Sequence, residues 1–206
     1  MADPNPPPPL AGEGRGGGAA AARDSPAATP LLTSPPKRGE ERGVHGLRLG
    51  LPIAALLLVL DQFSKWWILE VARLPEGRHI PLLSTGPFGL DLTMVWNRGV
   101  TFGLLSGDGP MNHLILALLA AVIAGLLLRW MARAETRPVA GALGAVVGGA
   151  VGNVIDRLRF GAVADFVDAH AWDWHWYVFN LADAAIVCGV AVLLADALFR
   201  RPPAGA

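Results

Sequence analysis

Four long apolar runs constrain this chain more than any other feature of its sequence. They cover about residues 47–72, residues 111–132, about 139–158 and 176–199. A helix needs roughly 20 apolar residues to cross the hydrocarbon core of a bilayer, and each run is close to that length. We therefore predict an all-α membrane protein with four transmembrane helices, and not the buried helical bundle of a soluble protein.

The composition agrees with a membrane protein and narrows the possible ligands. The chain is 52% hydrophobic and 17% charged, which is unusually apolar for a soluble domain. Its formal net charge is +0, so nucleic acid is not an expected partner. Cys188 is the only cysteine, which excludes an intrachain disulfide, and its apolar surroundings predict a small buried residue. No two histidines stand four residues apart, so we expect no metal site.

The first 45 residues differ in kind from the rest. Proline, glycine and alanine dominate this segment, and it has too few large apolar residues to offset the entropy lost on ordering. It does not resemble a secretory signal peptide, because the first apolar run begins only near residue 51 and no small-residue cleavage site follows it. The sequence thus predicts a disordered cytoplasmic extension over 1–45, a four-helix membrane domain over 46–201 and a short tail over 202–206.

Basic residues set the expected orientation in the membrane. They stand before the first run, between the second and third, and after the fourth, for example Lys37, Arg133 and Arg200. Because positively charged short loops stay in the cytoplasm, we predict that both termini are cytoplasmic and that the loops at about 73–110 and 158–176 face outward. Tryptophans gather at the outward ends of the first and fourth runs, as in an interfacial aromatic belt: Trp66, Trp67, Trp172, Trp174 and Trp176.

The unusual polar residues fall at the same outward ends in this topology. Asp61 and Lys65 are four residues apart in "DQFSK" and share a helix face. That spacing suits a local ion pair whose lysine reaches the interface, and the greater depth of Asp61 favours a structural hydrogen bond. In "NVIDR", Arg157 directly follows Asp156 and can neutralise it.

Asp165 and Asp183 have no basic neighbour in the sequence. Desolvation of an unpaired carboxylate raises its pKa, and two carboxylates at one membrane depth can share a proton. One of them can then activate a water molecule while the other protonates the carbonyl or the leaving group. Each residue alone is more often a helix cap or a structural hydrogen bonder. Together they favour a function, because ionisable residues inside a membrane are costly.

Four motifs in order carry a family resemblance. The segments "DQFSK", "NRGVTFGLLS", "GGAVGNVIDRLRFGAVADFVD" and "FNLADAAIVCG" resemble those of lipoprotein signal peptidase, also called signal peptidase II, over about residues 50–199. The resemblance implies an aspartic endopeptidase with four transmembrane helices in the bacterial inner membrane. Its implied substrate is a prolipoprotein whose cysteine carries a diacylglyceryl group, cut on the amino side of that cysteine near the outer face. The resemblance implies no cofactor, and it leaves the oligomeric state open.

The resemblance also distributes roles among the residues. It implies a catalytic dyad of Asp165 in "VADF" and Asp183 in "NLAD", with Asp156 as the competitor for the first place. We prefer Asp165, because Arg157 stands beside Asp156 in a helical setting suited to a scaffold. The segment 97–105 is expected to form a small extracytoplasmic β platform. The implied substrate-binding or supporting residues are Asn97, Asn153, Arg157, Asn180, Asp156, Asp61 and Lys65.

Two other classes of function compete with a peptidase. A small proton-coupled transporter would place its carboxylates near the bilayer midplane and would carry an inverted repeat. No convincing repeat is visible in this sequence, and its carboxylates cluster at one face. A non-catalytic scaffold built on glycine and alanine packing in the third and fourth runs would leave the acidic cluster unexplained.

Overall fold

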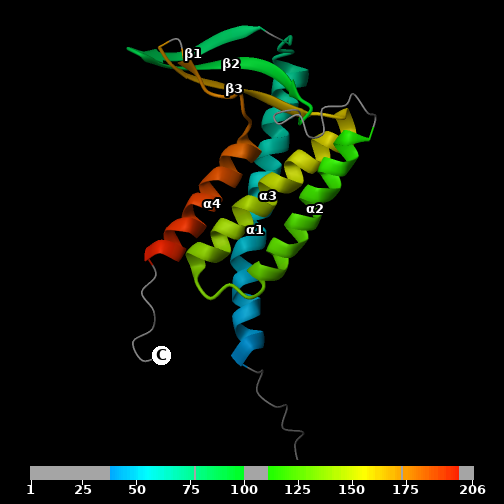
Figure 1. The fold of residues 1–206 in the computed structure, drawn as a ribbon, viewed down its shortest axis with the longest axis vertical. Helices are drawn as coiled ribbons and strands as arrows, with labels where there is room; N and C mark the ends of the chain where they lie inside the picture. The colour runs from blue at the N-terminus through cyan, green and yellow to red at the C-terminus, as the bar shows by residue number, and fades with distance from the viewer. Residues whose placement is uncertain (1–37, 77, 100–110, 173, 200–206) are drawn as a thin grey trace, which may run out of the picture. The chain divides into compact units, whose positions relative to one another are not determined.

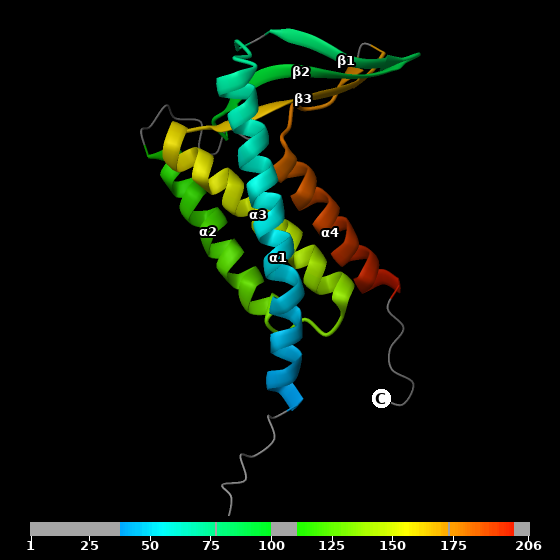
Figure 2. The same cartoon turned by 180° about the vertical axis from the view of Figure 1, so that it is seen from behind.

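The computed structural model describes residues 38–76, 78–99, 111–172 and 174–199. Figures 1 and 2 show helices standing side by side, with a sheet lying across one end of them. The elements in chain order are α1 (Arg38–Trp66), the π-helix η1 (Trp67–Val71), β1 (His79–Thr85), β2 (Phe88–Asn97), α2 (Asn112–Met131), α3 (Arg137–Phe160), β3 (Val163–Ala171), β4 (Trp174–His175) and α4 (Leu181–Phe199).

The prediction of four transmembrane helices is confirmed in length and composition. The four candidate spans of the described residues are Gly46–Val71, Asn112–Met131, Arg137–Phe160 and Leu181–Phe199. Helix α1 already begins at Arg38, so the last residues of the segment predicted to be disordered form its first turns. The rest of that prediction, residues 1–37, lies outside the described residues.

Helix α3 is the centre of the bundle, and it packs against each of the other three helices. In its most apolar stretch 61% of the residues are buried, against 17–22% in the other three spans. Small residues make this possible: the Cα of Gly144 lies against the backbone of Gly50, and Gly149 lies against the backbone of Ala182. Close backbone approach through glycine is the expected way to hold membrane helices together, and the third apolar run supplies the glycines for it.

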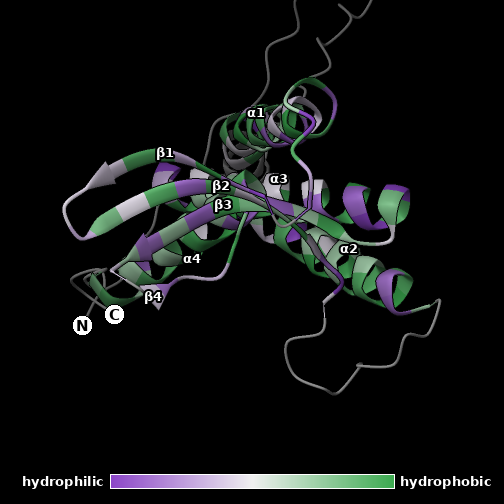
Figure 3. Ribbon diagram, turned by 90° about the horizontal axis from the view of Figure 1, so that it is seen from above, coloured by the Kyte–Doolittle hydropathy of each residue, from purple (hydrophilic) through white to green (hydrophobic). Residues whose placement is uncertain are grey.

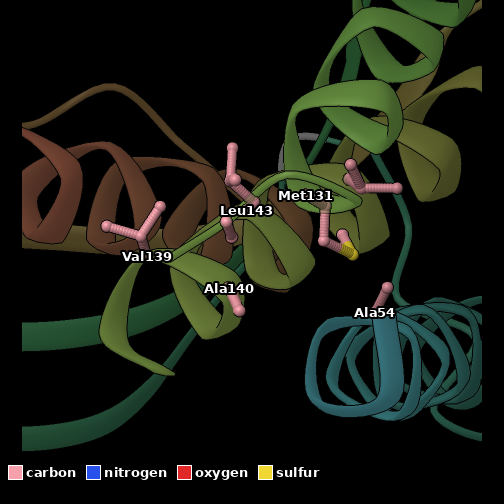
Figure 4. Packing of buried hydrophobic residues seen from close by; sticks show 7 residues of the cluster. Ala54, Met131, Val139, Ala140 and Leu143 are labelled. Atoms are coloured by element: carbon pink, nitrogen blue, oxygen red, sulfur yellow. The ribbon is translucent and has the colours of Figure 1, made fainter. Parts of the chain in front are cut away.

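A buried apolar cluster closes the end of the bundle remote from the sheet. Figure 4 shows Met131, at the end of α2, between Ala54 of α1 and the first turns of α3. Met131 and Leu143 are fully buried, and a flexible thioether fills irregular gaps well. Thr136 caps the following helix by accepting a hydrogen bond from the Val139 backbone N–H, with Pro138 in its first turn.

The sheet is antiparallel, with the strand order β1-β2-β3-β4, and Figure 3 shows it from above the helices. A small β platform was predicted and is present, but its strands come from residues 79–97 and 163–175. The predicted platform segment lies mostly in 100–110, outside the described residues. Asp165 was expected in a loop after the third run, and it lies on strand β3 instead.

The two faces of the sheet differ in character. Paired residues of antiparallel strands point to the same face, and successive residues alternate. The register therefore puts Asp165 of β3 on the face toward the helices and Asp168 on the opposite, outer face. The face of Asp165 carries the apolar side chains of Leu83, Phe88, Leu90 and Leu92. The face of Asp168 carries the polar side chains of Asp91, Thr93 and His170.

The surface of the bundle overturns one expectation. Cys188 of α4 was predicted to be buried, but it is exposed. In a membrane protein the lipid-facing surface is itself apolar, so an apolar neighbourhood in the sequence does not imply burial. All five tryptophans expected at the outward ends are exposed as well, and they lie at the end of the bundle that carries the sheet.

Candidate active site

Polar side chains accept hydrogen bonds from three backbone N–H groups at the start of α4. Asn180 precedes the helix, and its side-chain Oδ1 accepts a hydrogen bond from the Asp183 backbone N–H at 2.9 Å. The Asp183 carboxylate accepts one from the Asn180 backbone N–H at 3.2 Å. This reciprocal pair is a capping box. Asp61 of α1 adds a third cap by accepting from the Ala182 backbone N–H at 2.9 Å. Asp183 therefore lies in the first turn of α4, where the helix dipole favours a negative charge.

Asp165 reaches the same place from strand β3. Its side chain is buried, and its two oxygens accept hydrogen bonds from Asn180 Nδ2 at 2.7 Å and from Asn97 Nδ2 at 3.0 Å. Burial raises the pKa of Asp165 to about 7, and the nearby Asp183 carboxylate acts in the same direction, against the two amide hydrogen bonds. A carboxyl group with this pKa is poised to exchange a proton near neutral pH.

Two asparagines connect the carboxylates. Asn153 of α3 donates through Nδ2 to Asp183 Oδ1 at 2.7 Å. Asn180 Nδ2 lies 3.2 Å from Asn153 Oδ1 as well as 2.7 Å from Asp165 Oδ1. Because each amide offers both donors and an acceptor, these side chains fix Asp165 and Asp183 relative to one another across three elements.

A second acidic cluster lies behind the first. Lys65 Nζ is 2.8 Å from Asp61 Oδ2 and 2.8 Å from Asp156 Oδ2, and all three side chains are at most 3% exposed. Of the two alternatives for Lys65, an ion pair that reaches the interface and a residue that supports the site, its burial excludes the first. Asp156 is neutralised by Lys65, where the sequence suggested Arg157. Gln62 Nε2 donates to Asp156 Oδ1 at 3.1 Å, and Asp156 Oδ2 accepts from the Ala164 backbone N–H at 3.2 Å.

This arrangement ties the start of β3 to α1 and α3. Lys65 also donates to Asn153 Oδ1 at 3.2 Å, so the buried cation touches the amide that holds Asp183. Glycine is required nearby, because a Cβ at Gly152 would collide with the Asp61 carboxylate. Arg157 donates to the Asn153 backbone carbonyl at 3.3 Å, and it lies in the electrostatic field of Asp183 and Asp165.

A groove of about 1160 Å³ opens beside the first cluster, between the sheet and α4. Asp165 and Asp183 both line it, whereas Asp61, Lys65 and Asp156 do not. Its other walls are apolar or aromatic side chains of α4 and of the segment that follows β4, together with the end of β2. They are Val95, Trp96, Asn97, Arg98, Trp176, Tyr177, Val178, Phe179, Ala184, Val187 and Cys188.

The structure brings together all nine residues singled out from the sequence, in two connected layers. Asp165, Asp183 and Asn97 line the groove, and Asn153, Asn180, Arg157, Asp61, Lys65 and Asp156 stand behind it. Gln62 was not predicted as a site residue, although a polar side chain next to Asp61 in an apolar run was a usable signal. Within the described ranges, no group of three or more His, Cys, Asp or Glu could hold a metal ion.

The fold and the site define a multi-pass membrane protein with carboxylates gathered at one end of its helices, and comparison with known proteins agrees. The model of the family described as signal peptidase (SPase) II matches residues 53–199. A lipoprotein signal peptidase of Methylobacterium sp. (strain 4-46) is 48% identical over 155 residues, which cover 75% of this chain and 92% of that protein. One from Rhodopseudomonas palustris (strain ATCC BAA-98 / CGA009) is 43% identical over 164 residues, covering 78% and 98%.

A solved structure is similar too. A bacterial membrane enzyme determined by the in meso method at 1.9 Å superposes with a TM-score of 0.61 and 25% sequence identity, covering 74% of this chain and 94% of that one. The chain therefore belongs to the signal peptidase II family. It is a multi-pass peptidase of the bacterial inner membrane that removes signal peptides from prolipoproteins, which leaves the transporter and the scaffold without support.

Proposed function

We propose that the chain is an aspartic endopeptidase whose catalytic dyad is Asp165 and Asp183. The observation that carries this proposal is that the two carboxylates line the same groove and are held by one asparagine, Asn180. The competitor Asp156 is fully engaged by Lys65, Gln62 and a backbone N–H. It does not line the groove, so a substrate bound there would not reach it.

The dyad works by sharing one proton. Asp165, whose pKa burial raises to about 7, carries that proton, and we assign the role of the base to Asp183, which lies at the start of α4 and accepts a hydrogen bond from Asn153. Asp183 removes a proton from a water molecule in the groove as its oxygen attacks the scissile carbonyl carbon. Asp165 donates a hydrogen bond to the developing oxyanion, and a proton then passes to the leaving amine as the C–N bond breaks.

The surrounding polar groups position the substrate and the dyad. Asn97 and Asn180 hold Asp165, Asn153 holds Asp183, and Arg157 supplies a positive field to both carboxylates. Asp61, Lys65 and Asp156 form a scaffold that fixes the ends of three helices. These roles need no metal, because the two carboxyl groups supply both the base and the acid.

The groove suits a substrate with an acylated end. Its wall on α4 consists of Ala184, Val187 and Cys188, and Val187 is two-thirds exposed on the bundle surface. A diacylglyceryl group can leave its acyl chains in lipid along this wall while the peptide crosses the dyad. We infer cleavage on the amino side of the lipidated cysteine.

We infer that the sheet and the dyad face away from the cytoplasm and that both termini are cytoplasmic. The support is the excess of basic residues at the opposite end of the helices, such as Arg48, Arg133 and Arg137, over those at the sheet end. The latter are Arg73, Arg78, Arg98 and Arg159. Impermeant thiol labelling in a Cys188→Ala background tests this. A cysteine at Ser84 is expected to be labelled from outside the inner membrane, and one at Arg133 only after lysis. The reverse result would invert the topology.

The catalytic assignment is tested by cleavage of a diacylglyceryl-modified precursor. Asp165→Asn and Asp183→Asn are expected to abolish processing while the protein still folds. Near-normal cleavage by either variant would remove that residue from the dyad. Asp156→Asn and Asp156→Glu distinguish the competitor, because a scaffold role predicts lower stability with residual activity in the fraction that folds, whereas a catalytic role predicts a folded, inactive protein.

A further inference from the structure

The outer face of the sheet carries a polar cluster that the active site does not use. Its centre is Asp168 of β3, which is 2% exposed and stands three residues after Asp165 on the other face of the same strand. Around it lie side chains from each of the other strands: His79 of β1, Thr93 of β2 and His175 of β4. We call these four residues the sheet clasp.

The clasp joins the first strand of the sheet to the last through one buried carboxylate. His175 Nδ1 lies 3.1 Å from both carboxylate oxygens of Asp168. Thr93 Oγ1 donates to Asp168 Oδ2 at 3.4 Å, and His79 Nδ1 lies 2.7 Å from that hydroxyl and 3.8 Å from Asp168 Oδ2. Both imidazoles are about half exposed, with side-chain exposures of 55% for His79 and 49% for His175, whereas the Asp168 side chain is 3% exposed.

A third histidine holds the ring of His175 in place. His170 stacks on His175 with ring centroids 4.9 Å apart and an interplanar angle of 28°. Its Nε2 lies 3.4 Å from Asp91 Oδ2, and its ring covers Gly89, where a Cβ would collide with it. Its Nδ1 is buried and has no hydrogen-bond partner within the described part of the chain.

The clasp is connected to the groove through the short strand β4. That strand has two residues and pairs only through His170↔His175 and Ala171↔Trp174. The segment that follows is pinned to β3 by backbone hydrogen bonds, from Trp176 N to Ala169 O at 2.8 Å and from Phe179 N to Val167 O at 2.9 Å. Residues 176–179 form a wall of the groove and lead directly to Asn180.

We propose that Asp168 and His175, with His79, are positioning residues for the peptidase: they fix the groove wall 176–179, and they hold it more tightly when the imidazoles are protonated. A hydrogen bond between two charged groups is stronger than one with a neutral donor, and histidine is the side chain that changes charge between about pH 5 and 8. The other titratable or charged groups of the described residues near the clasp are Asp91, His170, Glu76 and Arg78. Asp91 offsets the like charge that a protonated His170 would present to His175.

The proposal rests on the peptidase activity of the chain and not on which carboxylates form the dyad. It predicts a pH effect on KM for a lipid-modified precursor. The KM of the unmodified protein is expected to rise about three- to tenfold more between pH 6 and pH 8 than the KM of a variant without the clasp. The reason is that hydrogen bonds from neutral imidazoles are weaker than those from charged ones. His175→Gln and Asp168→Asn are expected to raise KM at pH 6 by the same factor, and their KM should lack this additional rise with pH. Their kcat should change by less than about twofold. Titration of the catalytic carboxylates changes the KM of the wild type and of each clasp variant alike, so it cancels when their pH profiles are compared.

The matched control is His113→Gln, which changes a histidine of α2 that does not line the groove and is expected to keep the wild-type KM profile. Backbone hydrogen exchange provides a readout independent of activity: in His175→Gln and Asp168→Asn, the amides of Trp176 and Phe179 are expected to lose protection while those of α3 keep it. If both variants keep the wild-type change of KM with pH, or if the two amides stay equally protected, the proposal is wrong. If Asp165→Asn remains active but the clasp variants behave as expected, only the dyad assignment fails.

Discussion

The two carboxylate clusters at the sheet end of the bundle contain the same residue type but have different partners. Behind the groove, Asp61 and Asp156 share the buried cation of Lys65. At the groove, Asp165 and Asp183 are held by the neutral amides of Asn97, Asn153 and Asn180. A full positive charge opposes protonation of a carboxylate more strongly than a neutral amide does, and at Asp165 burial outweighs the two amide hydrogen bonds. We therefore propose that the partner decides whether a buried aspartate in this protein stabilises the fold or takes part in catalysis.

The largest expected effect separates the two clusters by activity. Asp165→Asn keeps the size of the side chain but removes its exchangeable proton, so the cleavage rate should fall by about 10²–10⁴-fold, the usual contribution of a general acid or base. Thermal unfolding should show an intact fold. An Asp165→Asn protein that processes its precursor at a normal rate would abolish the distinction between the clusters.

The next effect separates them by stability. Lys65→Met leaves two buried carboxylates without their cation, and breaking a buried ion pair from one side typically costs about 3–5 kcal/mol. The expected result is a marked fall in the thermal midpoint of the detergent-solubilised protein. The control is Arg129→Met, which removes an exposed cation near the end of α2 and should change the midpoint little. Equal midpoints for both variants would contradict a scaffold role for Lys65.

A smaller effect is expected at Asn180, which both caps α4 and donates a hydrogen bond to Asp165. Asn180→Ala removes the cap of α4, which typically costs about 0.5–2 kcal/mol, and it also removes the 2.7 Å hydrogen bond to Asp165. Both stability and kcat should fall. Asn180→Ser retains a capping oxygen and should recover stability without recovering kcat. Recovery of both by serine would mean that the amide has no part in orienting Asp165.

The last prediction concerns the pH dependence of stability. The pKa of Asp165 is raised from 3.8 to about 7 in the folded protein, so the folded state binds this proton more tightly than the unfolded chain. The folded protein therefore loses stability as pH rises from about 4 to about 7, and the loss is complete above that range. Asp165→Asn should remove this loss, so its thermal midpoint relative to wild type should be higher at pH 8 than at pH 4. If the thermal midpoints of the variant and the wild type differ equally at pH 4 and pH 8, folded Asp165 does not hold this proton more tightly than the unfolded chain.

The sequence was sufficient for the features that depend on local pattern. Run length predicted the spans, and the absence of a basic neighbour separated Asp165 and Asp183 from Asp61. It was insufficient where the outcome depends on residues far apart in the chain. Lys65 lies 91 positions from Asp156, so the ion pair between them could not be read from spacing, and the neighbouring Arg157 was the natural but wrong partner. The sheet was misplaced for the same reason, because its register joins segments on either side of α2 and α3.

The central position of α3 has a consequence for how the protein is made. Helices α1 and α2 pack mainly on α3 and little on each other, and most of the glycines that allow close packing lie on α3. During synthesis the first two spans therefore enter the membrane before the helix on which they mainly pack. Stable tertiary structure therefore forms only after the third span is made. The hydrogen bond from the start of α4 to Asp61 forms only after the fourth. Truncation after α2 should thus yield an inserted pair of helices that membrane quality-control proteases degrade, whereas the complete bundle is resistant.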